Sequence, residues 1–141
     1  DGASAIVATW RQEFGRKRCV SVFNTRPDKN HAEMLSKLSG ITSTWVFCPM
    51  PDSPCISRDD LFALAKKHNQ TATWCDTPGA AMRAARQQAG DQGAILVTGS
   101  HYLVGAIIPQ RFISGVHSAR SIGRVSWTQL LAAGQDRGAA F

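Results

Sequence analysis

The fold of this chain is indicated most clearly by one stretch near its C-terminal end, which reads Gly93-Ala94-Ile95-Leu96-Val97-Thr98-Gly99-Ser100-His101-Tyr102-Leu103-Val104-Gly105. Its first half is an unbroken apolar run with the length of a buried strand. Glycine and serine then turn the chain into a second apolar segment, residues 102–108. The stretch therefore predicts a strand that passes through a tight turn into a helix.

The same alternation of strand and helix continues upstream of this stretch. Short runs rich in apolar and β-branched residues predict strands at residues 18–24, 44–48, 71–75 and 93–98. Apolar residues at three- and four-residue steps, with Asn30, Ser57 and Asp76 or Thr77 as caps, predict helices at residues 3–14, after 30, after 57, and up to about 88. This order predicts an α/β, Rossmann-like three-layer domain whose sheet is mostly parallel, with helices on both faces.

The regular pattern ends at Pro109. We expect one domain over residues 1–112 and an appended tail of uncertain order over 113–141, with a short helix around residues 127–133. A chain of 141 residues, of which 43% are hydrophobic, fits a single core.

Composition excludes several classes of protein and site. The four cysteines are far apart and include no C-x-x-C pair, which argues against a metal site and favours reduced thiols in a cytoplasmic protein. No apolar run is long enough to span a membrane, and no signal peptide is visible. We expect a cytoplasmic monomer that binds neither membrane nor nucleic acid.

The net charge of +6 is compatible with anionic partners, but it is spread along the chain. Only Arg16-Lys17-Arg18 forms a basic cluster, at the expected junction of a helix and a strand. We interpret it as a solvated turn, and anion or nucleic-acid binding through the general charge is the weaker alternative.

Candidate binding residues follow the predicted strands, because ligands of open α/β sheets lie outside the carboxyl ends of the strands. In Thr98-Gly99-Ser100, glycine permits close approach, and the hydroxyls and helix amides could hold a carboxylate or phosphate oxygen. The alternative is a tight turn in which Ser100 only caps the helix.

Asp28 and Lys29 form a pair of opposite charge in the loop after the first strand. The ammonium could meet an anionic substrate, and the carboxylate could orient it; a solvated loop pair is the alternative. Ser100 and His101 are adjacent in sequence and resemble a Ser-His dyad only superficially. The chain contains neither a G-x-S-x-G elbow nor a phosphate-binding P-loop, so we predict no catalytic residue and no resident cofactor.

The stretch at residues 93–105 resembles a segment near the end of folylpolyglutamate synthases, members of the Mur ligase superfamily. Residues 19–23 with the following Asp28 and Lys29 are similar to a strand and loop of that family, and residues 76–89 to its Ala-rich helix. The resemblance implies the C-terminal domain of an ATP-dependent ligase of folate and one-carbon metabolism. In such an enzyme the amine of L-glutamate attacks a folate acyl phosphate.

By this resemblance, Ser100 would contact the glutamate carboxylate, and Lys29 with Asp28 would help hold glutamate or phosphate groups. The predicted substrate-binding set comprises Asp28, Lys29, Thr98, Gly99, Ser100, His101 and Tyr102.

This sequence also departs from the family pattern. The family's phosphate loop and metal elements are missing, so ATP and Mg²⁺ would be bound mainly by a separate ATPase domain, and these residues alone should not form the amide bond. The loop at 49–56 lacks the family's Arg after Pro; the first Arg comes at position 58. The alternative function is a noncatalytic Rossmann-like module that binds a partner protein through the tail.

Overall fold

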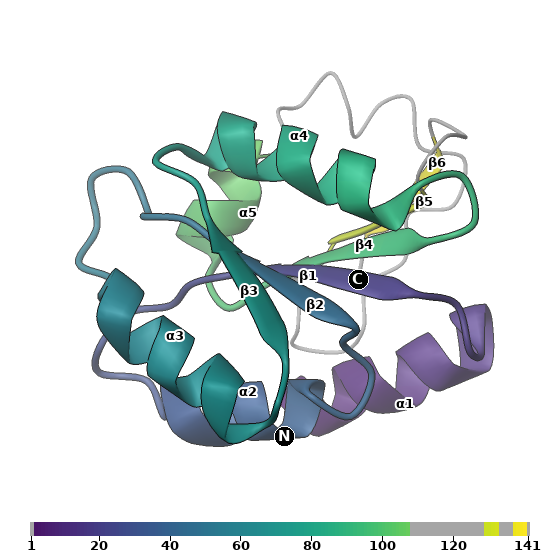
Figure 1. Ribbon diagram of the computed structural model, residues 1–141, viewed down its shortest axis with the longest axis horizontal. Helices are drawn as coiled ribbons and strands as arrows, with labels where there is room; N and C mark the ends of the chain where they lie inside the picture. The colour runs from purple at the N-terminus through teal and green to yellow at the C-terminus, as the bar shows by residue number, and fades with distance from the viewer. Residues whose placement is uncertain (1, 108–128, 133–136, 141) are drawn as a thin grey trace.

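The computed structural model describes residues 2–107, 129–132 and 137–140 (Figure 1). In chain order the elements are α1 (Gly2–Phe14), β1 (Cys19–Phe23), α2 (His31–Leu38), β2 (Thr44–Phe47), α3 (Arg58–Lys67), β3 (Thr71–Trp74), α4 (Pro78–Ala89), β4 (Ala94–Thr98), α5 (His101–Ile107), β5 (Gln129–Ala132) and β6 (Arg137–Ala140).

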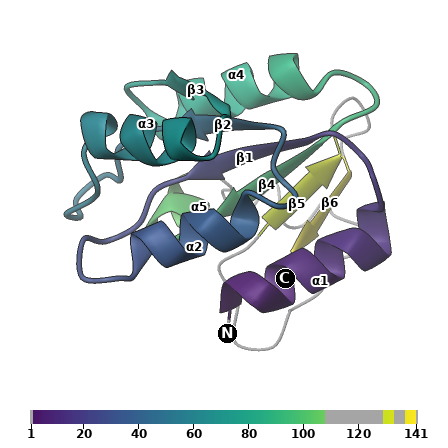
Figure 2. The same cartoon turned by 60° about the horizontal axis from the view of Figure 1, so that its bottom comes forward.

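These strands form one sheet in the order β3-β2-β1-β4-β5-β6. Strands β1 to β4 pair in parallel, whereas β5 pairs antiparallel with β4 and β6 with β5. Helices α4 and α5 cover one face, and α1, α2 and α3 cover the other (Figures 1 and 2). The predicted α/β fold with a mostly parallel sheet is confirmed.

The helix predicted around residues 127–133 is wrong where the structure describes that segment, because Gln129–Ala132 forms strand β5. Its sequence, Gln-Leu-Leu-Ala, has good helix propensity, but propensity is a weak preference that tertiary context overrides. Pairing with β4 satisfies backbone groups that an edge strand would leave open. The predicted domain boundary at residue 112 lies outside the described residues.

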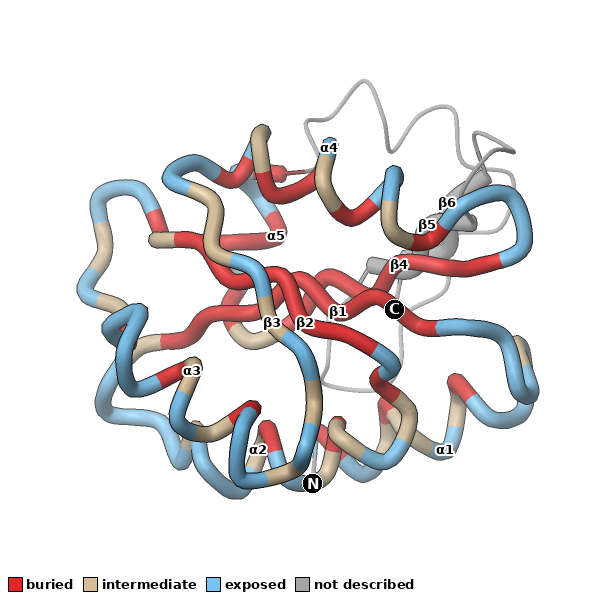
Figure 3. The backbone as a smooth tube through the Cα atoms, viewed as in Figure 1, coloured by how far each residue is buried: buried red, intermediate tan, exposed pale blue. Residues whose placement is uncertain are grey.

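The central strands of the sheet are buried (Figure 3), and alternation along them divides the core between the two faces. In β1, Val20 and Val22 face α4 and α5, whereas Cys19 and Phe23 face α1, α2 and α3. The second face is the aromatic one: Trp45 stacks on Phe47, with ring centroids 5.7 Å apart. Strands β1, β2 and β4 are buried along their whole length, whereas β3 is partly exposed. The buried strands hold their ends in fixed positions.

The predicted helix caps are also confirmed. Asn30, Ser57 and Thr77 each accept a hydrogen bond from the amide three residues later, at 3.3, 3.2 and 3.1 Å. Gly15 ends α1 with a φ of 60°, a conformation that favours glycine. Within the described residues, no helix combines the length and apolar character needed to cross a bilayer.

Candidate functional site at the carboxyl edge of the sheet

The parallel strands end level with one another at one edge of the sheet. Phe23 of β1 is in register with Phe47 of β2 and with Thr98 of β4. The chain turns away from β1 toward β2 on one side, and β4 lies on the other side, so the strand order reverses between β1 and β4. Such a switch point is where ligands bind in open α/β sheets. The three loops singled out by sequence therefore meet at one edge, which we call the carboxyl edge.

Asn24, the first residue after β1, holds two of these loops together. Its side chain is fully buried and makes four hydrogen bonds. It donates to the carbonyls of Cys48 (2.7 Å) and Ile56 (3.2 Å), and it accepts from the amides of Thr25 (2.7 Å) and Ile56 (3.0 Å). The loop at 49–56 is thus anchored to the end of β1, and the amide of Asn24 has no remaining capacity for a ligand.

Gly99 makes the close contact between the β1 and β4 loops. Its φ is 114°, and a Cβ at this position would lie 2.1 Å from the backbone oxygen of Asn24. The hydroxyl of Thr25 donates to the carbonyl of Gly99 at 3.0 Å. The sequence predicted that this glycine permits a close approach. The group that approaches it in the structure is the backbone of Asn24.

Ser100 is the N-cap of α5. It is 8% exposed, and its hydroxyl oxygen accepts a hydrogen bond from the amide of Tyr102 at 3.2 Å. This geometry is that of the capping alternative. The hydroxyl proton of Ser100 has no acceptor among the described residues, so it remains available as a donor.

The other predicted residues of this turn differ in accessibility. Thr98 is 2% exposed, so its side chain belongs to the interior, whereas the ring of Tyr102 is 44% exposed. The backbone of His101 begins α5, and its side chain lies outside the described part.

The loop after β1 pairs its charges differently from the prediction. Asp28 forms its ion pair with Arg26, at 3.2 Å, and not with Lys29. The hydrogen bond from Arg26 is the main reason why the pKa of Asp28 lies below its usual value, and the charges of Arg26 and Lys29 add to the effect. Arg26 precedes Asp28 by two residues, and the turn between them places its guanidinium beside the Asp28 carboxylate. The Lys29 side chain is exposed and has no ion pair within the described ranges.

Burial keeps two thiols at this edge, those of Cys48 and Cys75, protonated. Cys48 follows β2 and is buried, which raises its pKa to about 12; burial also raises the pKa of Cys75, after β3. All four cysteines are free, as predicted. In the part of the chain that the structure describes, no cluster of His, Cys, Asp and Glu side chains is arranged to hold a metal.

The sequence profile of one protein family matches residues 1–101, and its description reads "Mur ligase, glutamate ligase domain". The match extends over most of the chain and reaches the turn between β4 and α5. The chain belongs to this family. Among curated protein sequences, none matches the chain.

Solved structures of folylpolyglutamate synthases share the fold of this glutamate ligase domain. The Mycobacterium tuberculosis enzyme complexed with ADP and AMPPCP has a TM-score of 0.67 at 21% identity, over 74% of this chain and 26% of that one. E. coli FolC in complex with DHPP and ADP has a TM-score of 0.62 at 20% identity, over 72% and 23%. The Thermotoga maritima synthase has a TM-score of 0.62 at 21% identity, over 89% and 27%.

The chain therefore corresponds to about a quarter of the length of these synthases. The resemblance to their C-terminal domain, stated from the sequence, is confirmed in family and in fold.

Two residues at the carboxyl edge were missed by sequence reasoning. Asn24 follows a buried strand, and Asn is common where strands end, but nothing in the sequence shows that its amide reaches residues 48 and 56. Arg26 stands two positions before Asp28, a spacing that could have indicated the ion pair.

Proposed function

We propose that this chain is the glutamate-binding part of an ATP-dependent ligase of the folylpolyglutamate synthase type. In the proposed reaction the amine of L-glutamate attacks a folate acyl phosphate, forming an amide and releasing phosphate. The observation that carries the proposal is the match to the glutamate ligase domain over residues 1–101, which ends in the turn at the switch point of the sheet.

The charges at the carboxyl edge support binding of a small dicarboxylate. Asp28 neutralises Arg26, so Lys29 provides the uncompensated positive charge of the β1 loop. On the β4 side, the hydroxyl of Ser100 can donate its proton while its oxygen caps α5. An ammonium and a hydroxyl on the loops of adjacent strands are suited to two carboxylate groups.

Activation of the folate would need a second part of the enzyme. The solved M. tuberculosis and E. coli enzymes are complexes with ADP, and each of those chains is about four times as long as the part that aligns here. We propose that ATP and Mg²⁺ are bound mainly by an ATPase domain joined to this one. The isolated 141 residues should then form no amide bond, and ligation of glutamate to folate by them alone would contradict this part of the proposal.

Binding of L-glutamate to the isolated chain tests the central claim. We expect weak, saturable amide shifts in NMR spectra, concentrated at residues 25–31 and 99–103, because one half of the cleft is contributed by this domain. Lys29→Gln should weaken the effect, whereas Lys67→Gln, which removes an exposed lysine from the end of α3, should not. L-Glutamine, with one carboxylate fewer, serves as the matched ligand. Calorimetry that detects no binding of glutamate at millimolar concentration would remove the proposal.

A further inference from the structure

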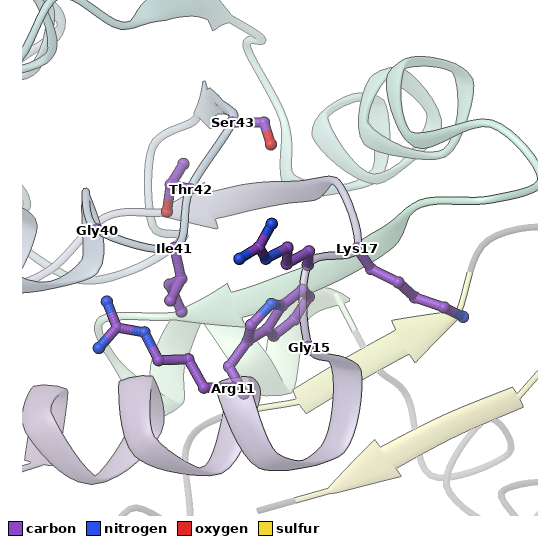
Figure 4. A pocket seen from close by; sticks show the side chains of 9 residues that line it. Arg11, Gly15, Lys17, Gly40, Ile41, Thr42 and Ser43 are labelled. Carbon is purple, nitrogen blue, oxygen red and sulfur yellow. The ribbon is translucent and has the colours of Figure 1, made fainter.

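A second candidate site lies at the opposite, amino-terminal edge of the sheet, where α1 leads into β1 and α2 into β2. A hollow of about 570 Å³ opens there (Figure 4). Its volume is within the range of small-molecule sites, about 300–1,000 Å³. The lining residues are Trp10, Arg11, Gly15, Arg16, Lys17, Gly40, Ile41, Thr42 and Ser43.

The charge of this lining is entirely positive. Arg11, Arg16 and Lys17 contribute three cations, and no carboxylate belongs to the lining that the structure describes. None of the three has an ion pair within the described ranges, although Arg26 and Lys37 elsewhere do have carboxylate partners. Unpaired like charges around one hollow raise the local concentration of anions.

Arg11 lies beside the turn after α2. Its Nη2 lies 3.5 Å from the place where Gly40 would carry a Cβ, which is an ordinary van der Waals distance. In Figure 4, Arg11 reaches from α1 toward Gly40, whereas Lys17 extends away from both. Arg11 is therefore a stronger candidate for direct contact than Lys17, which would act through its charge; Arg16 also belongs to the lining.

Ser43 adds a neutral donor at the rim. Its hydroxyl oxygen accepts a hydrogen bond from the amide of Cys19 at 3.2 Å, and its proton has no acceptor in the described part of the chain. Thr42, by contrast, donates to the carbonyl of Leu38 at 2.8 Å and is buried. Two guanidinium groups and one hydroxyl thus surround the hollow with uncommitted donors.

We propose that this hollow binds an anion that carries a diphosphate group. Guanidinium groups donate paired hydrogen bonds that match phosphate oxygens, and two such groups suit two linked phosphates. The hollow is at the other end of the strands from the carboxyl edge. The inference is therefore independent of glutamate binding and would survive its failure.

The test compares two double variants of the full chain that lose equal charge. Arg11→Gln with Arg16→Gln removes both guanidinium groups of the hollow, and Lys67→Gln with Arg83→Gln removes two exposed cations from α3 and α4. Calorimetry with pyrophosphate at about 50 mM salt should show one site. The first double variant should weaken binding at least about tenfold, and the second less than about twofold.

Shifts of backbone amide signals in NMR spectra locate the site. A second ligand, ADP, shows whether the bound diphosphate belongs to a nucleotide. Pyrophosphate should shift the amides of residues 40–43 and leave those of residues 99–103 unchanged. ADP bound as tightly as pyrophosphate would show that the diphosphate alone is recognised; tighter binding at the same amides would identify a nucleotide as the source. Absence of saturable binding, equal weakening in both double variants, or shifts at the carboxyl edge would overturn the proposal.

Discussion

The two ends of the parallel sheet use their polar groups in opposite ways. At the carboxyl edge, the side-chain amide of Asn24 is fully hydrogen-bonded to the backbone of neighbouring loops, and Gly99 packs closely against the backbone of Asn24. At the amino edge, Arg11 and Arg16 border an open hollow and have no ion pair within the described residues.

This difference separates positioning from binding. Groups that are buried and fully hydrogen-bonded hold loops in place, and their removal should be felt mainly as lost stability. Exposed groups without partners contribute little to stability, and their removal should be felt mainly in binding. The carboxyl edge thus combines hydrogen-bonded loops with few groups available to a ligand, chiefly Lys29 and Ser100. At the amino edge, the available groups, Arg11 and Arg16, lie on the end of α1 and the turn after it.

Gly99→Ala should have the largest effect on stability. The new Cβ would lie 2.1 Å from the Asn24 oxygen, and a φ of 114° is strained for alanine. We expect a loss of about 3–5 kcal/mol, measured by urea denaturation. Gly105→Ala in α5, where nothing lies within 4 Å of the added atom, is the control and should be neutral or stabilising. Equal stability of the two variants would refute the close contact.

Asn24→Ala should come next, with a loss of about 2–4 kcal/mol. The change removes a buried partner from two carbonyls and from the amide of Thr25, whereas the amide of Ile56 keeps its bond to the carbonyl of Thr25 at 3.2 Å. Asn30→Ala removes the cap of α2 and an exposed hydrogen bond to Glu33, and it should cost about 1 kcal/mol. If the two substitutions lower the melting temperature equally, Asn24 does not hold the loops of the carboxyl edge together.

The buried thiols allow both ends to be compared by pH. Cys19 lies at the amino end of β1 and Cys48 beyond the carboxyl end of β2; burial raises the pKa of each from 9.0 to about 12. Above pH 9 the unfolded chain loses these protons first. The free energy of unfolding should therefore fall as pH rises from 9 to 12, by about 1 kcal/mol per pH unit for each thiol.

Cys19→Ala and Cys48→Ala should each flatten this decline by a similar amount, because the two thiols are shifted alike. The measurement is the urea midpoint across that pH range, compared with the unchanged chain. A slope that neither variant alters would contradict the raised pKa values.

Ser100→Ala should lower stability by only about 1 kcal/mol, the usual cost of a lost N-cap. Ser57→Ala, which removes the cap of α3, is matched to it in chemistry. The two should melt alike, but only Ser100→Ala should weaken glutamate binding under the proposed function. Weakened binding in both variants would assign the effect to general loosening of the domain.

The smallest effect on stability is expected at the amino edge. Arg11→Gln and Arg16→Gln should change the free energy of unfolding by no more than about 0.5 kcal/mol, because both side chains are exposed and without ion-pair partners in the described part. A large loss in chemical denaturation would mean that these arginines serve the fold, and it would erase the contrast between the two edges.

Much of the fold could be predicted from the sequence because the deciding signals are local. The caps Asn30, Ser57 and Thr77 act over three residues, and short runs rich in apolar and β-branched residues marked every strand of the parallel sheet. The strand at Gln129–Ala132 was missed because its pairing with β4 is not local. The candidate site was predicted only in outline: its loops do meet, but their internal bonds were not foreseen.

Periodicity, capping and family pattern therefore define which segments are helices and strands, and which loops follow the strands, since each depends on residues close together in the chain. The tertiary structure alone decides that Gly99 faces the backbone of Asn24, and that Arg11 of α1 lies beside Gly40 after α2. These neighbours are tens of residues apart in sequence. Their contacts result from packing of the sheet and its helices, which no local pattern encodes.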